Sequence, residues 1–420
     1  MLKGFNELKE TEIEKLIYYL DNNVEFYHKF LSEFDERERT SEIFNKLPII
    51  DKKQIFNNYK QFVCKSIENQ VIEKLANGRY LFDKDCSIES NGKKMWIEST
   101  TGSTGMPFST IKSEAERIIL GRNIWKLRNS ISPIRTNEFF AYMHNRNGGY
   151  PFPFREEVNS EYRKKREIEY LKNEEYKWWH LYPKQLDGLC SLVSRNNVVF
   201  ESLEVVECNG AFFSKEEKKR WEKIFGCKVV NNYGCREIWT IAYSCKYGEL
   251  HINDKSVFVE LVDDNNNIIS EDGVIGNIIV TSKILKSLPY IRYKVGDKGY
   301  FVKGACKCGK KEKRIVIVPD RSMILGTNTN GNIIFRSVIN NVVIKGNVHE
   351  FDSINVYQEN KNEFFIYVKG NCEQKEKLEH EFIKWSNWFL EDENNKYIFY
   401  YNSDKEFKSI FTANMKGKKL

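Results

Sequence analysis

Residues 99–107 read Ser-Thr-Thr-Gly-Ser-Thr-Gly-Met-Pro and concentrate groups that could bind an anion. Five of these nine side chains carry a hydroxyl, and glycines stand at positions 102 and 105. Glycine lets the backbone turn through positive φ, so that consecutive N–H groups can point at one anion. No Gly-Lys-Ser/Thr follows, so the stretch is not a Walker loop. The composition is that of a phosphate-binding loop, and equally that of a solvated surface turn.

Three later stretches carry residue types suited to a nucleotide site. Residues 231–237 read Asn-Asn-Tyr-Gly-Cys-Arg-Glu, residues 290–299 read Tyr-Ile-Arg-Tyr-Lys-Val-Gly-Asp-Lys-Gly, and the chain ends Lys-Gly-Lys-Lys-Leu. Taken singly, each residue type has an ordinary structural explanation. A tyrosine at a strand end usually packs in the core, an aspartate after glycine usually belongs to a turn, and a lysine at the end of a chain is usually solvated. Their occurrence together, in this order, favours a site.

In this order the four stretches resemble the motifs of the acyl-adenylate-forming enzymes. Within that superfamily the chain is similar to the phenylacetate–CoA ligase-like branch, and particularly to its members in capsular-polysaccharide biosynthesis. Leu47–Lys52, reading Leu-Pro-Ile-Ile-Asp-Lys, and Gly248–Ile252, reading Gly-Glu-Leu-His-Ile, fit the same branch. The motifs span nearly the whole chain, so the resemblance extends from end to end.

The resemblance implies an α/β fold, with a large layered adenylation domain over residues 1–319 and a small mobile α+β lid domain over residues 320–420. It implies a ligase that uses ATP and Mg²⁺ to convert a small carboxylic acid into an acyl-adenylate. The acyl group would then pass to CoA or to another thiol or amine. One rival interpretation transfers it to a sugar or amine in surface-polysaccharide synthesis, and another is a degenerate nucleotide-binding regulator. The identity of the acid and the oligomeric state stay open.

The resemblance also assigns roles to residues of the first two motifs. Tyr233, followed by Gly234, would stack on adenine, and Glu237 would hold Mg²⁺ through a hard carboxylate oxygen. The β- and γ-phosphates would be bound by the loop residues Thr100, Thr101, Gly102, Ser103, Thr104 and Gly105.

In the later motifs, Asp297 would accept hydrogen bonds from the ribose hydroxyls, and Arg321 would donate to the same sugar. Lys418 would bridge the carboxylate and the α-phosphate, strengthening its contacts as charge shifts in the transition state. Gly417 selects Lys418 among the terminal lysines, because the family pattern places the lysine directly after glycine.

The chain departs from the family pattern in three places. Met106 stands where the loop often has lysine, and Cys235 and Arg236 replace smaller and hydroxyl-bearing residues before Glu237. Residues 320–323, Asp-Arg-Ser-Met, lack the glycine before arginine and the acidic residue that marks the hinge. The last departure bears on the domain rotation that precedes thiol transfer.

A second constellation has the composition of a metal site. Cys245 and His251 are six residues apart, and Cys306 and Cys308 form a Cys-x-Cys pair further on. Three thiolates and an imidazole are a common tetrahedral zinc set, with no position left for water, so the role would be structural. Four unconnected residues are the alternative, since cysteine is often simply buried. The branch resemblance includes a Cys-x-Cys-Gly here and favours zinc.

The chemistry requires elements that hold these stretches in place. Apolar residues at helical spacing within 6–36 predict an amphipathic helix, and Ser113-x-x-Glu116 is a capping box for a helix to about Lys126. A strand–helix succession after Val198 argues for a layered α/β domain. The predicted strands are Val198–Cys208, Cys227–Asn231, Val257–Val262, Ile275–Thr281, Ile354–Val356, Phe364–Val368 and Tyr397–Tyr400, with helices at Lys215–Phe225 and about Glu373–Leu390.

The composition limits the partners and the compartment. The 420 residues carry 66 basic and 59 acidic side chains, a net charge of +7 that does not single out nucleic acid. Glutamates in Met1–Leu20 argue against a signal peptide, and no apolar run is long enough to span a bilayer. We therefore expect a cytoplasmic protein with no membrane insertion and with reduced cysteines. A Ser/His/Asp hydrolase is unsupported because Gly-x-Ser-x-Gly is absent.

Overall fold

The computed structural model describes the chain except residues 1–9, 36–40, 77–85, 101–107, 142–167, 319–323, 403–410 and 415–420, and shorter stretches between 170 and 214 and between 328 and 392. The described residues form two compact units. The first contains those from 10 to 98 and from 110 to 318. The second contains those from 324 to 414, with the described part of 99–109.

The N-terminal helices of the first unit follow the apolar spacing in the sequence. They are α1 (Glu10–Asn23), α2 (Glu25–Leu31), the 3-10 helix η2 (Ser41–Lys46), α3 (Lys52–Asn57), α4 (Tyr59–Phe62) and α5 (Asn69–Ala76). Ile13, Ile17 and Leu20 of α1 are buried, as helical spacing predicts. A capping box formed by Asp51 and Gln54 begins α3. Among the described residues, no helix is long and apolar enough to cross a membrane.

A three-stranded sheet and a long helix follow. β1 (Cys86–Ser90), β2 (Lys93–Thr100) and β3 (Phe108–Ser113) are neighbours in that order. The predicted capping box is present, because the Ser113 side chain accepts from the Glu116 N–H while the Glu116 side chain accepts from the Ser113 N–H. It begins α6 (Glu114–Asn129), which ends three residues beyond the predicted position.

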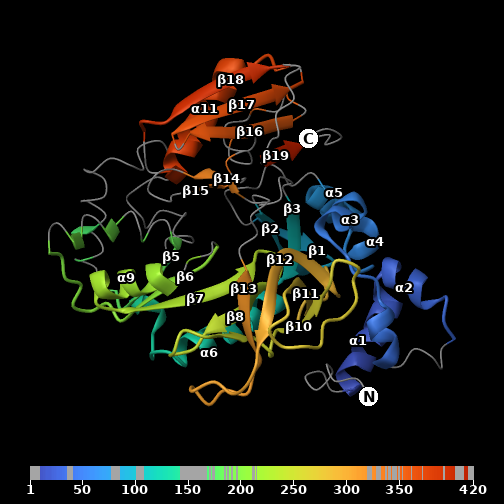
Figure 1. Ribbon diagram of the computed structural model, residues 1–420. Coiled ribbons are helices and arrows are strands. Elements are labelled where there is room, and N and C mark those ends of the chain that lie inside the picture. The colour runs from blue at the N-terminus through green and yellow to red at the C-terminus, as the bar shows by residue number, and fades with distance from the viewer. Residues whose placement is uncertain are drawn as a thin grey trace. The chain divides into compact units, whose positions relative to one another are not determined.

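The main sheet joins a parallel half to an antiparallel half (Figure 1). Within the described chain its order is β10-β11-β12-β13-β9-β8-β7-β6-β5-β4. The parallel strands are β4 (Phe139–Ala141), preceded by the 3-10 turn η4 (Thr136–Glu138), β5 (Trp178–Leu181), β6 (Val205–Cys208) and β7 (Lys228–Cys235). The antiparallel strands are β8 (Trp239–Ser244), β9 (Leu250–Ile252), β10 (Val257–Val262), β11 (Gly276–Ser282), β12 (Tyr293–Val302) and β13 (Arg314–Val318).

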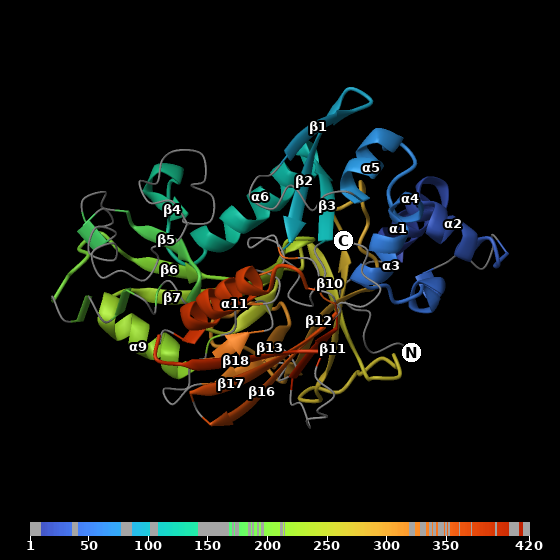
Figure 2. The same ribbon diagram turned by 90° about the horizontal axis from the view of Figure 1, so that it is seen from above.

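Helices cover both faces of the parallel half. Figures 1 and 2 show α6 and α9 (Lys215–Phe225) on opposite sides of β5, β6 and β7. Successive strand residues point to opposite faces. Accordingly Trp179 and Val206 pack in one buried cluster with Trp221 of α9, whereas Trp178 and Val205 pack in another cluster against the end of α6. This layered arrangement confirms the predicted α/β fold class.

One predicted strand is wrong over most of its length. The sequence predicts a strand over Val198–Cys208, but β6 contains Val205–Cys208 alone. Leu203 N–H donates to the Phe200 carbonyl, which closes a local turn in the first half of the segment. Phe200 and Leu203 are buried in the cluster on the face that α9 covers, whereas Val199 is exposed, so the hydrophobicity of this segment does not require extended backbone.

The second unit is a mixed sheet with one helix. Its strands β16 (Ser353–Asn360), β17 (Glu363–Lys369), β18 (Lys396–Tyr401) and β19 (Phe411–Asn414) take the order β18-β17-β16-β19, and α11 (Lys375–Leu390) follows β17. Val356, Phe364 and Phe382 are fully buried in one cluster. A separate two-stranded ladder pairs β14 (Ile324–Thr327) with β15 (Ile333–Phe335). The predicted helix and three strands of this region are confirmed.

Candidate functional site

The tyrosine–glycine motif lies at the end of β7, where the pairing with β8 is irregular. The register between the two strands shifts between Tyr233 and Gly234. Trp239, on the facing strand, has a φ of +69°, which bulky residues rarely adopt. A Cβ on Gly234 would lie 1.9 Å from the Trp239 carbonyl oxygen. The two backbones approach so closely that glycine is required at 234.

We expect Gly234→Ala to lower the free energy of unfolding by about 1–3 kcal/mol, because the added methyl group forces the β7 and β8 backbones apart. The measurement is thermal unfolding of the purified variant. Gly121→Ala, in α6, is the matched control, because its Cβ would meet no atom within 4 Å. Equal stability of the two variants would contradict the close approach.

The ribose candidate Asp297 lies in a bulge of β12. Asn277 pairs with Lys298 and Ile279 with Lys294, so one residue of β11 stands opposite three of β12. Gly296, with φ of +97°, makes this bulge possible. The bulge brings Asp297 to Tyr233, whose hydroxyl donates to Asp297 Oδ2 at 2.9 Å. Two residues predicted to bind the same nucleoside, 64 positions apart in the sequence, are therefore in direct contact.

The metal candidate Glu237 is buried, and one of its two carboxylate oxygens already has partners. Its Oε1 lies 2.8 Å from Lys52 Nζ and accepts from the Tyr293 hydroxyl at 3.0 Å. Its Oε2 is buried and has no hydrogen-bond partner among the described residues. Burial raises the pKa of Glu237, but the Lys52 charge and its hydrogen bond outweigh burial and hold the pKa below the ordinary value. An ionised carboxylate with one free oxygen fits the ligand chemistry of Mg²⁺.

Lys52 is a site residue that the sequence reasoning missed. It is the first residue of α3, and its side chain is 15% exposed. The signal was present, since Lys52 closes the Leu-Pro-Ile-Ile-Asp-Lys stretch that fits the branch pattern. Nothing in that stretch, however, shows that the lysine meets a carboxylate 185 residues later.

Glu98 is a second missed residue, and it lies one position before the hydroxyl-rich stretch. It is 1% exposed, and its Oε2 accepts from Lys112 Nζ and from the Trp239 indole N–H, each at 2.9 Å. Lys112 also donates to the Arg236 carbonyl at 2.9 Å. Lys112 therefore links the end of β2 to the residue that precedes Glu237.

The four predicted zinc ligands lie together. The ligand atoms of Cys245, His251, Cys306 and Cys308 are all within 4.8 Å of one another. The ten cysteines, all within the described residues, form no disulfide. His251 Nδ1 lies 3.0 Å from the Glu312 carbonyl oxygen, so a proton there leaves Nε2 free to coordinate, and Nε2 faces the Cys308 sulfur at 3.3 Å.

Local contacts support this cluster as a ligand set. Burial lowers the pKa of His251, which favours the neutral imidazole that a metal requires. The Lys310 backbone N–H donates to Cys308 Sγ at 3.4 Å, and Gly309 between them has a φ of +79°. The donor set and its second shell fit a tetrahedral Zn²⁺.

Several predicted site residues lie outside the described part of the chain. They are Thr101, Gly102, Ser103, Thr104, Gly105, Arg321 and Lys418. Thr100 is described as the last residue of β2 by its backbone alone. Of the predicted nucleotide and magnesium residues, the structure thus describes the side chains of Tyr233, Asp297 and Glu237.

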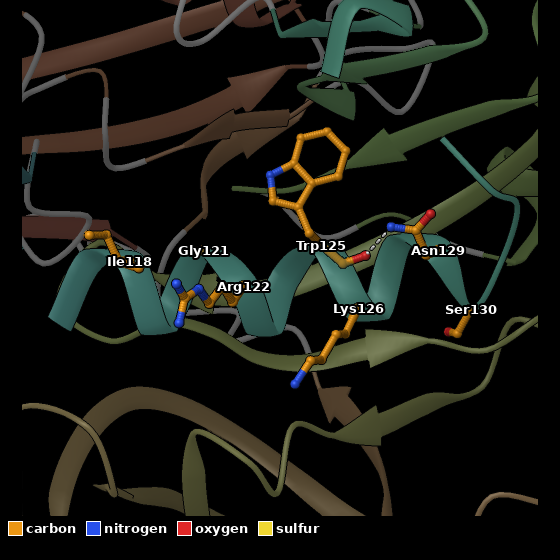
Figure 3. Close-up of a pocket in the computed structure, with 7 residues that line it drawn as sticks. All are labelled: Ile118, Gly121, Arg122, Trp125, Lys126, Asn129 and Ser130. Atoms are coloured by element: carbon orange, nitrogen blue, oxygen red, sulfur yellow. Dashed lines mark hydrogen bonds between the residues drawn. The ribbon is translucent and has the colours of Figure 1, made fainter. Parts of the chain in front are cut away.

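A pocket lies against α6, and Figure 3 shows the residues that line it. The residues that line it are Ile118, Gly121, Arg122, Trp125, Lys126, Asn129 and Ser130. None of the seven residues that line this pocket is a predicted site residue. We place the candidate site at Tyr233, Glu237 and Asp297, because Tyr233 contacts Asp297 directly. The charges of both Glu237 and Asp297 also act on Lys52, where they raise the pKa against the lowering effect of burial.

The fold was compared with solved structures. The structure of 2-hydroxyisobutyryl-CoA ligase in complex with 2-HIB-AMP and CoA, in the thioesterification state, matches with a TM-score of 0.63. The match covers 96% of this chain and 88% of that one at 15% identity. The chain has the fold of this CoA ligase. An open conformation of the same ligase, in complex with 2-HIB-AMP and CoA, matches with a TM-score of 0.56 at 14% identity, over 95% of this chain and 88% of that one.

Sequence comparison gives a weaker relation. No family model matches the chain. Protein CapK of Staphylococcus aureus is 24% identical over an alignment of 304 residues that covers 69% of this chain and 62% of that protein. The match thus spans less than two thirds of the relative. The structural matches confirm the fold that the sequence motifs indicated.

Proposed function

We propose that this protein activates a small carboxylic acid with ATP. A carboxylate oxygen attacks the α-phosphorus, the bond to the β-phosphate breaks, and pyrophosphate leaves from an acyl-adenylate. The observation that carries the proposal is the 2.9 Å hydrogen bond between Tyr233 and Asp297, within an adenylate-forming fold. Because the Tyr233 hydroxyl occupies Asp297 Oδ2, a ribose hydroxyl would bind the other oxygen or displace the phenol.

The protein groups act by alignment and charge rather than by covalent chemistry. Tyr233 offers a flat ring for adenine, and Asp297 offers an acceptor for the sugar. Glu237 would hold Mg²⁺ through Oε2, while Lys52 and Tyr293 fix Oε1. When bound, Mg²⁺ neutralises charge on the phosphates. Lys52 and Tyr293 are positioning residues in this scheme.

For the second half-reaction we propose CoA as acceptor. Its thiolate would attack the acyl carbonyl, and the bond to AMP would break. The complex of 2-hydroxyisobutyryl-CoA ligase with 2-HIB-AMP and CoA supports this choice. The residues from 320 to 420 would form the lid that carries Lys418, and its closure would exclude water from the mixed anhydride.

A pyrophosphate-release assay with a panel of short aliphatic, aryl and amino acids tests the first step. We expect ATP- and Mg²⁺-dependent release with at least one acid, and the matching acyl-AMP by mass spectrometry. Addition of CoA, and separately of amine or sugar acceptors, then identifies the acceptor. A chain that binds ATP but releases no pyrophosphate with any acid would be a nucleotide-binding regulator instead.

We further infer that Cys245, His251, Cys306 and Cys308 bind one zinc ion per chain. The four ligand atoms within 4.8 Å of one another support this inference. They come from the β8–β9 region and from the segment between β12 and β13. Four protein ligands leave no open position, so the ion would stabilise the fold and take no part in the reaction.

A further inference from the structure

Three cationic side chains converge on one buried carboxylate. Around Glu98 lie Lys112 Nζ at 2.9 Å, an Arg117 terminal nitrogen (Nη1) at 3.4 Å and Arg236 Nε at 3.8 Å. These four groups carry a net charge of +2. Burial raises the pKa of Glu98, but the charges of Lys112, Arg236 and Arg117 together hold it below the ordinary value. We call these four residues the Glu98 cluster.

The members of the Glu98 cluster differ in exposure. The side chains of Glu98 and Lys112 are 1% and 0% exposed and form a buried pair. The side chains of Arg117 and Arg236 are 23% and 31% exposed, so both can meet a ligand from solvent. The buried pair is already neutral, and the two guanidinium groups therefore add positive charge at its accessible side.

Aromatic rings hold Arg117 in place. Its guanidinium carbon lies 4.3 Å from the centroid of the Trp96 ring and 5.5 Å from that of Trp239. A guanidinium stacked on aromatic faces loses little further freedom when it binds an anion, and its planar fork suits phosphate. Arg117 is thus preorganised for an anionic ligand.

Another buried ion pair in the same unit shows a different charge balance. Arg128 donates to both oxygens of Glu207, at 2.8 and 3.0 Å, and the pair is neutral. Asn232 and Tyr243 satisfy the remaining capacity of that carboxylate. Such a pair is the usual structural solution. The Glu98 cluster instead brings three cations to one carboxylate.

The sequence position of the cluster suggests the ligand. Residues 99–107 contain hydroxyls and glycines but no lysine or arginine, so this stretch offers a triphosphate no charge partner. Glu98 directly precedes the stretch, and Arg236 directly precedes the magnesium candidate Glu237. On the basis of the proposed function, we propose that Arg117 and Arg236 bind the β- and γ-phosphates of ATP. Glu98 and Lys112 position them.

Nucleotide titrations test this proposal without requiring turnover. We expect Arg236→Met to weaken ATP binding about 10-fold or more while AMP binding changes less than about twofold, since AMP lacks the β- and γ-phosphates. Arg122→Met is the matched control, because this substitution removes the same charge. Arg122 lines the pocket against α6 (Figure 3) and does not belong to the Glu98 cluster. The control substitution should leave both affinities unchanged. Equal weakening of ATP and AMP, or unchanged ATP binding, would overturn the proposal.

The conservative variant Arg236→Lys gives a second test that a purely structural role would not pass. It keeps the positive charge at the same position but lacks the planar fork of arginine. We expect it to bind ATP more tightly than Arg236→Met does, with AMP binding unchanged, and an Arg236→Lys variant as weak as Arg236→Met would refute the phosphate role. Pyrophosphate release by the wild type reports on the proposed function separately, since ATP binding and its dependence on Arg236 are measured without any acid.

Discussion

Lys418→Ala is expected to reduce acyl-adenylate formation about a hundred- to thousandfold while ATP still binds. Removing a preorganised charge from such a transition state costs about 3–4 kcal/mol. The lysine would contact the carboxylate and the α-phosphate as charge shifts between them, whereas the phosphate groups of the ground state have other partners. ATP–pyrophosphate exchange with the active acid measures this step, and a titration with ATP measures binding in the same variant.

Lys416→Ala is the control for charge at the same end of the chain. It removes an identical side chain two residues away, on the other side of Gly417. We expect it to change the exchange rate less than about threefold. If the two variants exchanged pyrophosphate equally fast, the glycine-based assignment of Lys418 would be wrong.

Loss of the zinc site is expected to destabilise the first unit without changing the chemical step. Metal that binds the folded chain alone stabilises it by about 4 kcal/mol at a free concentration about 1,000 times its Kd. Cys308→Ser, which removes a partly exposed ligand, should therefore lower the zinc content from one ion per chain to near zero and lower the melting temperature. Elemental analysis and thermal unfolding of protein purified without chelators measure the two effects.

Cys86→Ser is the matched control, because Cys86 is partly exposed, lies in β1 and does not belong to the cluster. It should retain both zinc and stability. A wild-type chain that contains no zinc but melts at the same temperature with and without added zinc would exclude the metal site. Loss of ATP turnover at unchanged stability in Cys308→Ser would instead contradict a structural role.

Local sequence signals predicted the elements that local physics determines. The capping box at Ser113 and Glu116 fixes the start of α6, because its hydrogen bonds join residues three apart. β10 coincides with the predicted Val257–Val262, which is rich in valine, contains one charged residue, Glu260, and is bounded by polar turns. In both cases the deciding contacts lie within a few residues, so the pattern alone was sufficient.

Contacts between distant residues could not be predicted in the same way. No pattern within Leu47–Lys52 indicates that Lys52 forms an ion pair with Glu237. Likewise, no pattern in β2 indicates that three cationic side chains lie around Glu98. The motif order did predict that Tyr233 and Asp297 serve one ligand, and the structure brings them into contact. The sequence pattern did not predict the bulge in β12 or the close approach of the β7 and β8 backbones at Gly234, and these two features set the geometry of the contact.

The junction between β13 and β9 has a consequence for how the main sheet assembles. The strands from β10 to β13 pair with their neighbours in chain order, so each ladder closes a short loop. β13 and β9 share one register pair within the described residues, Arg314 with His251, which are 63 positions apart (314 minus 251). Closing so long a loop costs more conformational entropy than closing a hairpin, and a single pair of backbone-bonded residues offsets little of that cost.

We therefore expect this junction to form late in folding and to open early in local unfolding. His251 is itself one of the four clustered ligands, and the other three flank the same two strands. The ligand set is then completed only when the strands on either side are already paired. An ion bound there would stabilise a sheet whose strands are already paired, and it would not initiate the folding of the chain.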